Sequence, residues 1–217
     1  MLTRKAAVEG VGSALLLAAV VGSGIMGERL SGGNAAITLL ANSLATGGAL
    51  LAILSAFGPL SGAHLNPLVT IVLSARGEFR WRDAPGYIAA QAAGAVIGVA
   101  AAHLMFGGPV FQASHRDRSG AGLLLGEAVA TFGLLAVVLG CGKRPAAASV
   151  AAYITAAYWF TSSTSFANPA VTLARSLTDT FAGIRLADVP AFMAAQAVGA
   201  AAAYALFRWL KPLPEAA

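Results

Sequence analysis

Long apolar stretches separated by short polar breaks run through almost the whole chain. Six of them have the length of about 17–25 residues that a helix needs to cross the hydrocarbon core of a bilayer. They lie at residues 6–26, 36–57, 85–106, 121–142, 147–163 and 189–209. Two weakly apolar stretches, 66–75 and 168–178, are too short to span, and each begins at an Asn-Pro pair. Because proline is favoured in the first turn of a helix, each short stretch predicts a half-length helix that starts at its pair.

The composition favours a membrane protein over a soluble one. Of the 217 residues, 58% are hydrophobic and 11% are charged, whereas a soluble domain has about 25% charged residues. The mean hydropathy is +0.74. Six spans with short connections use nearly the whole chain, so we expect one transmembrane domain over residues 1–217. The fold class is therefore predicted to be all-α membrane, with six transmembrane helices and two re-entrant half-helices.

The net charge of +5 raises the question of a nucleic-acid partner. The basic residues lie at the ends of apolar segments, which fits membrane topology better, because cytoplasmic loops carry an excess of Lys and Arg. With both termini in the cytoplasm, the inner side holds the larger set, namely Arg4, Lys5, Arg76, Arg80, Arg82, Lys143, Arg144, Arg208 and Lys211. The outer side then holds the smaller set, namely Arg29, Arg116, Arg118, Arg175 and Arg185. We therefore expect cytoplasmic termini and no nucleic-acid binding.

The two halves of the chain repeat each other, about residues 1–106 and about residues 120–210. Three blocks match in the same order: 9–22 with 127–140, 66–70 with 168–172, and 85–94 with 190–199. Each half has three spans, and an odd number makes the second half enter the membrane from the opposite side. The sequence therefore predicts inverted repeats related by an axis in the membrane plane.

Inversion brings the two short helices together. They lie in opposite halves of the bilayer, and both start near its middle with their N-termini facing each other. Each N-terminus carries roughly half a positive charge, so the pair repels cations, including protons passed along water. Asn66 and Asn168 cap these ends and offer amide donors to a passing oxygen. This arrangement indicates a pore for uncharged solutes; that Asn-Pro merely starts a turn is disfavoured by its equivalent place in both repeats.

The segment SGAHLNPLVT (residues 61–70) resembles the first signature of the aquaporin and aquaglyceroporin family, and SFANPA (165–170) resembles the second. The first differs only at Leu68, where the family has Ala. The resemblance implies a passive channel in the bacterial inner membrane, built as a right-handed bundle and assembled as a homotetramer with one pore per subunit. It assigns the pore motifs to Asn66, Pro67, Leu68, Asn168, Pro169 and Ala170. We find no nucleophile–base set, metal cluster or cofactor motif, so we expect neither an enzyme nor a bound cofactor or metal.

Three ionisable residues inside or beside the spans need an explanation, because a buried charge in a membrane requires partners. Glu9 and Glu127 occupy equivalent places in the repeat. In the family, the matching acids brace the backbone of the two half-helix loops. His64 lies two residues before Asn66 and borders the cytoplasmic side of the pore in the family. A structural hydrogen bond and a gating role are both open for it.

The family's selectivity filter is the place where this sequence departs from water channels. Water-selective relatives use an aromatic residue, a His, a residue from the second loop, and an Arg directly after Asn-Pro-Ala. Carried over by spacing from the two Asn residues, these positions are Thr46, Ala156, Ser165 and Val171. A small hydroxyl thus replaces the aromatic ring, and Val replaces an Arg that supplies a fixed charge and five donors.

Both changes widen the pore. They favour glycerol-type polyols and neutral metalloid acids, together with water, and the combination resembles a bacterial subgroup associated with arsenic resistance, whose solute is arsenite as As(OH)₃. The alternatives are a strict water channel and a coupled secondary transporter, which can also have inverted repeats and broken helices.

Arg175 lies four residues after Val171, on the same face of the predicted half-helix. It could reach into the outer vestibule and partly replace the missing Arg. The interpretation that we favour from sequence is an Arg that faces interfacial water or pairs with Asp179 at i+4, because such pairs are common on helix surfaces.

Overall fold

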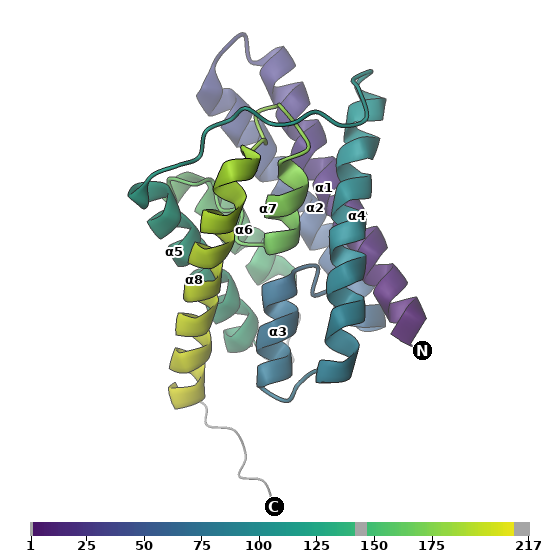
Figure 1. Cartoon of the computed structure of the whole chain (residues 1–217), viewed down its shortest axis with the longest axis vertical. Helices are drawn as coiled ribbons and strands as arrows, with labels where there is room; N and C mark the ends of the chain where they lie inside the picture. Colours follow the sequence, from purple (N-terminus) through teal and green to yellow (C-terminus); the bar gives the residue numbers. More distant parts are fainter. Residues whose placement is uncertain (1, 142–146, 211–217) are drawn as a thin grey trace, which may run out of the picture.

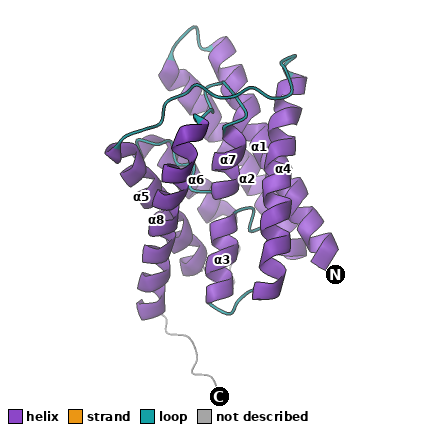
Figure 2. Cartoon of the chain, in the orientation of Figure 1, coloured by secondary structure: helices purple, strands orange, loops and turns teal. Residues whose placement is uncertain are grey.

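The computed structural model describes residues 2–141 and 147–210, and over these residues it contains helices and no strands (Figure 2). The long helices are α1 (Leu2–Leu30), α2 (Ala35–Ser61), α4 (Ala84–Met105), α5 (Ala121–Cys141), α6 (Ala147–Phe160) and α8 (Val189–Leu210). The short α3 (Pro67–Ala75) and α7 (Pro169–Arg175) begin at the proline of each Asn-Pro pair, and single 3₁₀ turns, η1 (Trp81–Asp83) and η2 (Leu186–Asp188), precede α4 and α8. By length and hydropathy, five helices can cross a membrane, and α6 is a shorter apolar helix. The predicted all-α membrane fold is confirmed.

The two halves of the chain pack in the same way and interlock at the centre. α1 packs against α2 and α4, and α5 packs against α6 and α8. α3 and α7 lie one above the other between the long helices (Figure 1). Each of them contacts both α4 and α8, so each half-helix is held by the long helices of both halves. We call the two ends of the bundle the α3 end and the α7 end, after the half-helix that runs toward each.

The first helix extends beyond its apolar stretch. The hydropathy pattern predicted a span over 6–26, but α1 continues to Leu30. Its last turn carries Glu28, whose carboxylate accepts hydrogen bonds from Arg116 Nη2 (2.7 Å) and from the backbone N–H of Phe181 (2.8 Å). The apolar pattern marks only the part that faces hydrocarbon, whereas the helix itself continues into the polar connections at the α7 end.

The second half-helix is shorter than the predicted stretch 168–178, because it ends at Arg175. The backbone N–H groups of Ser176 and Leu177 bond to carbonyls three residues earlier, at 3.1 and 3.0 Å. Such bonds tighten the last turn of a helix and end it. The chain then folds back, and the N–H of Ile184 bonds to the carbonyl of Arg175 (3.3 Å).

Two equivalent glycines allow the backbones of neighbouring helices to approach closely. A Cβ at Gly94 of α4 would lie 2.0 Å from the carbonyl oxygen of Gly10 in α1, and one at Gly199 of α8 would lie 2.1 Å from that of Ala128 in α5. Real Cβ atoms do not approach this closely, so both positions need glycine for the backbones to meet. Because the two contacts hold α4 and α8, they also fix the walls against which α3 and α7 pack.

Candidate functional site

The two Asn side chains cap their own helices and bond to each other's loops. Asn66 Oδ1 accepts from the N–H of Leu68 (2.9 Å), and Asn168 Oδ1 accepts from the N–H of Ala170 (3.0 Å). Asn66 Nδ2 donates to the carbonyl of Ala167 at 2.8 Å. Asn168 Nδ2 donates to the carbonyl of the equivalent residue in the first loop, Leu65, at 2.7 Å. An amide nitrogen carries two hydrogens, so each side chain keeps a second N–H beyond this cross-link.

The loops before the two Asn residues have strained backbones at matching positions. Ala63 and Leu65 in the first loop have φ of 45° and 50°, and Ser165 and Ala167 in the second have 51° and 49°. Non-glycine residues rarely adopt this left-handed region, and they keep it only where the surroundings hold them. The paired conformations therefore require fixed hydrogen-bond partners from the neighbouring helices.

Glu9 of α1, which is fully buried, supplies those partners for the first loop. Its carboxylate accepts from the backbone N–H of His64 at 3.0 Å and of Leu65 at 2.7 Å. It also accepts from Ser61 Oγ (2.7 Å) and from Gln91 Nε2 of α4 (2.9 Å). Four donors thus surround one carboxylate, which offsets the cost of placing it between apolar helices.

Glu127 of α5 has matching surroundings in the second half except for the serine hydroxyl, and it is also fully buried. Its carboxylate accepts from the backbone N–H of Phe166 (2.8 Å) and of Ala167 (2.9 Å). The third donor is Gln196 Nε2 of α8, at 2.6 Å. The two loop N–H groups and the glutamine match those around Glu9 position by position in the repeat. Each carboxylate therefore joins a half-helix loop to a long helix of its own half.

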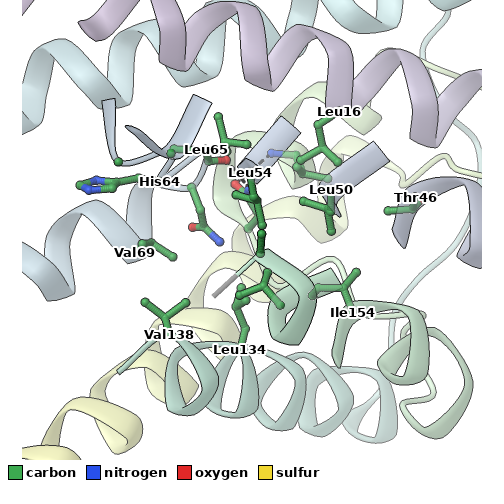
Figure 3. Close-up of a pocket in the computed structure, with 18 of the residues that line it drawn as sticks. Leu16, Thr46, Leu50, Leu54, His64, Leu65, Val69, Leu134, Val138 and Ile154 are labelled. Carbon is green, nitrogen blue, oxygen red and sulfur yellow. Dashed lines mark hydrogen bonds between the residues drawn. The ribbon is translucent and has the colours of Figure 1, made fainter. Parts of the chain in front are cut away.

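A cavity of about 990 Å³ runs along the inside of the bundle and passes both Asn residues. It reaches from Arg76 at the C-terminal end of α3 to Arg175 at the C-terminal end of α7. Its walls carry mainly aliphatic side chains from both halves, among them Leu16, Leu50, Leu54, Val69, Leu134, Val138 and Ile154. Figure 3 shows His64 and Val69 toward one end of this cavity and Thr46 toward the other. Both half-helix N-termini thus meet at one continuous space.

Three of the four expected filter residues line this cavity. Thr46, Ser165 and Val171 are buried and belong to its wall. Thr46 Oγ1 lies 3.2 Å from the hydroxyl oxygen of Tyr158, within hydrogen-bonding distance. Ser165 Oγ is buried and has no hydrogen-bond partner among the described residues. These side chains therefore present small groups and hydroxyls at the α7 end.

The fourth expected filter residue, Ala156, does not line the cavity and is exposed on the outside of α6. The wall is formed instead by Ile154 and Tyr158, which are four residues apart and therefore share one face of the helix. Ala156, midway between them, points to the opposite face. Counting twelve residues back from Asn168 across a loop thus gave a residue outside the cavity wall. The four-residue spacing of Ile154 and Tyr158 is the feature of the sequence that places these two on one helix face.

The other residues of the two motifs face away from the cavity. Pro67, Leu68, Pro169 and Ala170 are buried but are not part of its wall. Leu68, the one departure from the family signature, packs in an apolar cluster with Leu135 and other side chains of α5 and α8. The larger side chain is therefore accommodated in packing between helices, outside the cavity wall.

His64 takes part both in local packing and in the cavity wall. Its Nδ1 lies 3.1 Å from Thr70 Oγ1, and its ring lies edge-on to Phe79 with centroids 4.9 Å apart. The ring also forms part of the wall on the α3 side of Asn66. His64 thus has a structural contact and also lies at the cavity wall, so the structural and the gating roles left open by the sequence are both compatible with its position.

Arg175 does not face interfacial water, and Asp179 is not its partner. Only 1% of Arg175 is exposed, and its side chain belongs to the cavity wall. Asp179 accepts from the backbone N–H of His115 (2.9 Å), and its other oxygen lies 3.1 Å from His115 Nδ1. These two bonds lower the pKa of Asp179. The i+4 rule failed because the chain after α7 turns back and carries Asp179 toward a different loop.

Within residues 2–141 and 147–210, no group of three or more His, Cys, Asp or Glu side chains is placed to hold a metal ion. The polar groups of the cavity wall are amides, hydroxyls, the His64 ring, the Glu78 carboxylate and the guanidiniums of Arg76 and Arg175. The carboxylates of Glu9 and Glu127 lie behind the wall and are bonded to backbone N–H groups of the two loops. Such a set binds and orients a solute by hydrogen bonds.

Residues 1–160 match the family described as Major intrinsic protein. The chain is 50% identical over 212 residues to "Aquaglyceroporin AqpS" of Rhizobium meliloti, covering 96% of this chain and 91% of that one. A shorter match, 51% identical over 51 residues, joins 24% of this chain to 19% of the "Glycerol uptake facilitator protein" of Bacillus subtilis. The fold is similar to the X-ray structure of the aquaglyceroporin from Plasmodium falciparum, with a TM-score of 0.77, 22% identity and 98% of each chain covered.

Proposed function

The chain belongs to the major intrinsic protein family, whose aquaglyceroporins are channels and not enzymes, and on that premise we propose that it conducts small uncharged solutes passively. The observation that carries this proposal is the single cavity that passes both Asn residues and continues between α3 and α7. Passive flux needs only a continuous path whose polar groups replace part of the solute's hydration. The resemblance to the family found in the sequence is confirmed.

The proposed solutes are glycerol-type polyols and neutral metalloid acids such as arsenite, together with water. The side chains proposed to form the filter are Thr46, Tyr158, Ser165 and Val171, which line the cavity at the α7 end. Three hydroxyls give hydrogen-bonding partners to a polyhydroxy solute, while Val171 gives an apolar wall. The names of two relatives, an aquaglyceroporin and a glycerol uptake facilitator, support the same class.

Glu9 and Glu127 are proposed to brace the two loops, which argues against a coupled transporter. Such a transporter needs an ionisable group near the middle of the membrane that is free to bind a coupling ion or proton. Both carboxylates here accept two backbone N–H groups and a glutamine amide each. Protonation would break bonds that hold strained loops, so these acids are poorly suited to cycle during transport.

For topology and assembly we propose one transmembrane domain over residues 1–217, a homotetramer, and an inner-membrane location with both termini in the cytoplasm. In support, the beginning of α1 and the end of α8 lie toward the α3 end of the bundle (Figure 1). Lys143, Arg144 and Lys211, which contribute to the inner charge excess, lie outside the described residues. If crosslinking in membranes yields only monomers, the tetramer is contradicted. If a tag on the N-terminus is accessible only from outside the cell, the topology is contradicted.

A panel of solutes tests the proposal. Proteoliposomes that contain the purified protein should take up glycerol and arsenite down their gradients faster than empty vesicles, and should also pass water. The uptake rate should rise in proportion to the outside concentration. If water passes but glycerol and arsenite do not, the protein is a strict water channel. If none of the three passes, the channel proposal is wrong.

A further inference from the structure

Arg175 is a buried charge that the filter residues do not explain. It is the last residue of α7 and lies one turn beyond Val171, and only 1% of it is exposed. Its side chain nevertheless belongs to the wall of the cavity, with Val171 and Tyr158. The guanidinium is therefore almost wholly buried and lies beside the path between the two halves.

The partners of Arg175 use only part of its hydrogen-bonding capacity. Its Nε donates a short hydrogen bond to the carbonyl of Ala182, and its guanidinium carbon lies over the ring of Phe166, 3.3 Å from the centroid. Within the described ranges 2–141 and 147–210, no carboxylate forms an ion pair with it and its two Nη groups make no hydrogen bond. A guanidinium has five N–H donors, so four of those of Arg175 make no hydrogen bond with the described residues.

A second arginine on the same ring provides a contrast. The guanidinium of Arg118 lies 4.8 Å from the centroid of Phe166. It donates to the carbonyls of Gly183 (2.7 Å), Ser163 (3.2 Å) and Phe181 (3.2 Å), and it is not part of the cavity wall. Arg118 thus uses its donors to join loops to one another. The Nη groups of Arg175, in contrast, make no hydrogen bond with the described residues and lie beside the cavity.

We propose that Arg175 supplies the fixed positive charge and the N–H donors of the pore at its α7 end, one turn away from Val171. A buried positive charge without a carboxylate partner repels cations strongly in a poorly screened site. Its Nη groups donate to the hydroxyl oxygens of uncharged solutes, with the planar geometry that arginine provides. The pore is therefore widened at Val171 without losing its barrier to cations. This inference rests on the proposed channel function.

The test compares Arg175→Met, which keeps side-chain length and removes the charge, with Arg29→Met as a matched control. Arg29 also lies over an aromatic ring, 5.0 Å from the centroid of Phe106, and also donates to a backbone carbonyl, but it is outside the cavity. Proteoliposomes are loaded with a pH-sensitive dye, and proton flux and glycerol flux are measured on the same preparations. Proton flux through Arg175→Met should rise at least about tenfold over wild type, while Arg29→Met stays at the wild-type level.

Arg175→Lys keeps the proposal testable if the Met variant does not assemble, because Lys retains the charge and can still donate to Ala182. This variant should exclude protons as wild type does, but its ratio of glycerol to urea flux should change, because a point charge lacks the planar fork. The inference is overturned if Arg175→Met conducts glycerol and its proton flux stays at the wild-type level. It is also overturned if Arg175→Lys has the wild-type ratio of glycerol to urea flux. A wild-type protein that conducts no solute refutes the channel instead, so the two failures are distinguishable.

Discussion

Glu127→Ala should destabilise the protein by at least about 3 kcal/mol, because the change leaves three buried N–H donors without an acceptor and each costs about 1–3 kcal/mol. Two of these donors belong to Phe166 and Ala167, and the third is Gln196 Nε2. Ala167 also has a left-handed backbone, which depends on such partners. The thermal unfolding midpoint of the detergent-solubilised protein measures this loss. Glycerol flux per folded molecule should fall as well, because the carbonyl of Ala167 accepts the hydrogen bond from Asn66 Nδ2 that joins the two loops at the cavity.

The matched control removes a carboxylate that is half exposed. Glu78→Ala breaks only the ion pair with Arg76, at 2.7 Å, where the Glu78 side chain is 52% exposed. Exposed pairs contribute about 0–1 kcal/mol, so its unfolding midpoint should stay near that of wild type. A Glu127→Ala protein that unfolds at the wild-type temperature and conducts normally would show that the second loop does not depend on this carboxylate.

Thr46→Phe combined with Val171→Arg should narrow the pore and reduce glycerol and arsenite flux at least about tenfold, while water still passes. The ring fills the space beside Tyr158, whose hydroxyl now lies 3.2 Å from Thr46 Oγ1. The new guanidinium takes the place of the small aliphatic side chain of Val171 in the cavity wall. Paired stopped-flow measurements of water and glycerol permeability in proteoliposomes give the ratio directly.

Ala156→Phe is the control for that double variant, because it adds the same ring to α6 on the face away from the cavity. Its glycerol-to-water ratio should equal that of wild type. If Ala156→Phe narrowed the solute range and the double variant did not, the filter would include Ala156 and would not be formed by Thr46 and Val171.

The Asn-Pro pairs were sufficient to predict the two half-helices, because proline and an Asn cap act within one turn of the chain. The helices observed begin at Pro67 and Pro169. The inverted arrangement also followed from sequence, since it needs only the matched blocks and the parity of the spans. Local chemistry and repeat symmetry are therefore enough to predict the fold without any knowledge of side-chain contacts.

The positions of Tyr158 and Arg175 could not be predicted in the same way. Tyr158 faces inward because of the rotation of α6, and a residue count across the loop to Asn168 does not determine that rotation. Arg175 is buried because the chain after α7 folds back and offers the carbonyl of Ala182. Both depend on how a loop packs against a helix, which is a tertiary property. Of the residues proposed to act on the solute, Tyr158 and Arg175 are thus the ones that sequence locates least well.

The central claim is passive conduction of an uncharged solute, and the most direct measurement is the initial rate of glycerol entry into proteoliposomes with and without a transmembrane proton gradient. A channel predicts a rate that rises in proportion to the glycerol gradient and does not change when the proton gradient is imposed, reversed or collapsed. Glycerol entry that saturates with concentration and requires the proton gradient would contradict the claim.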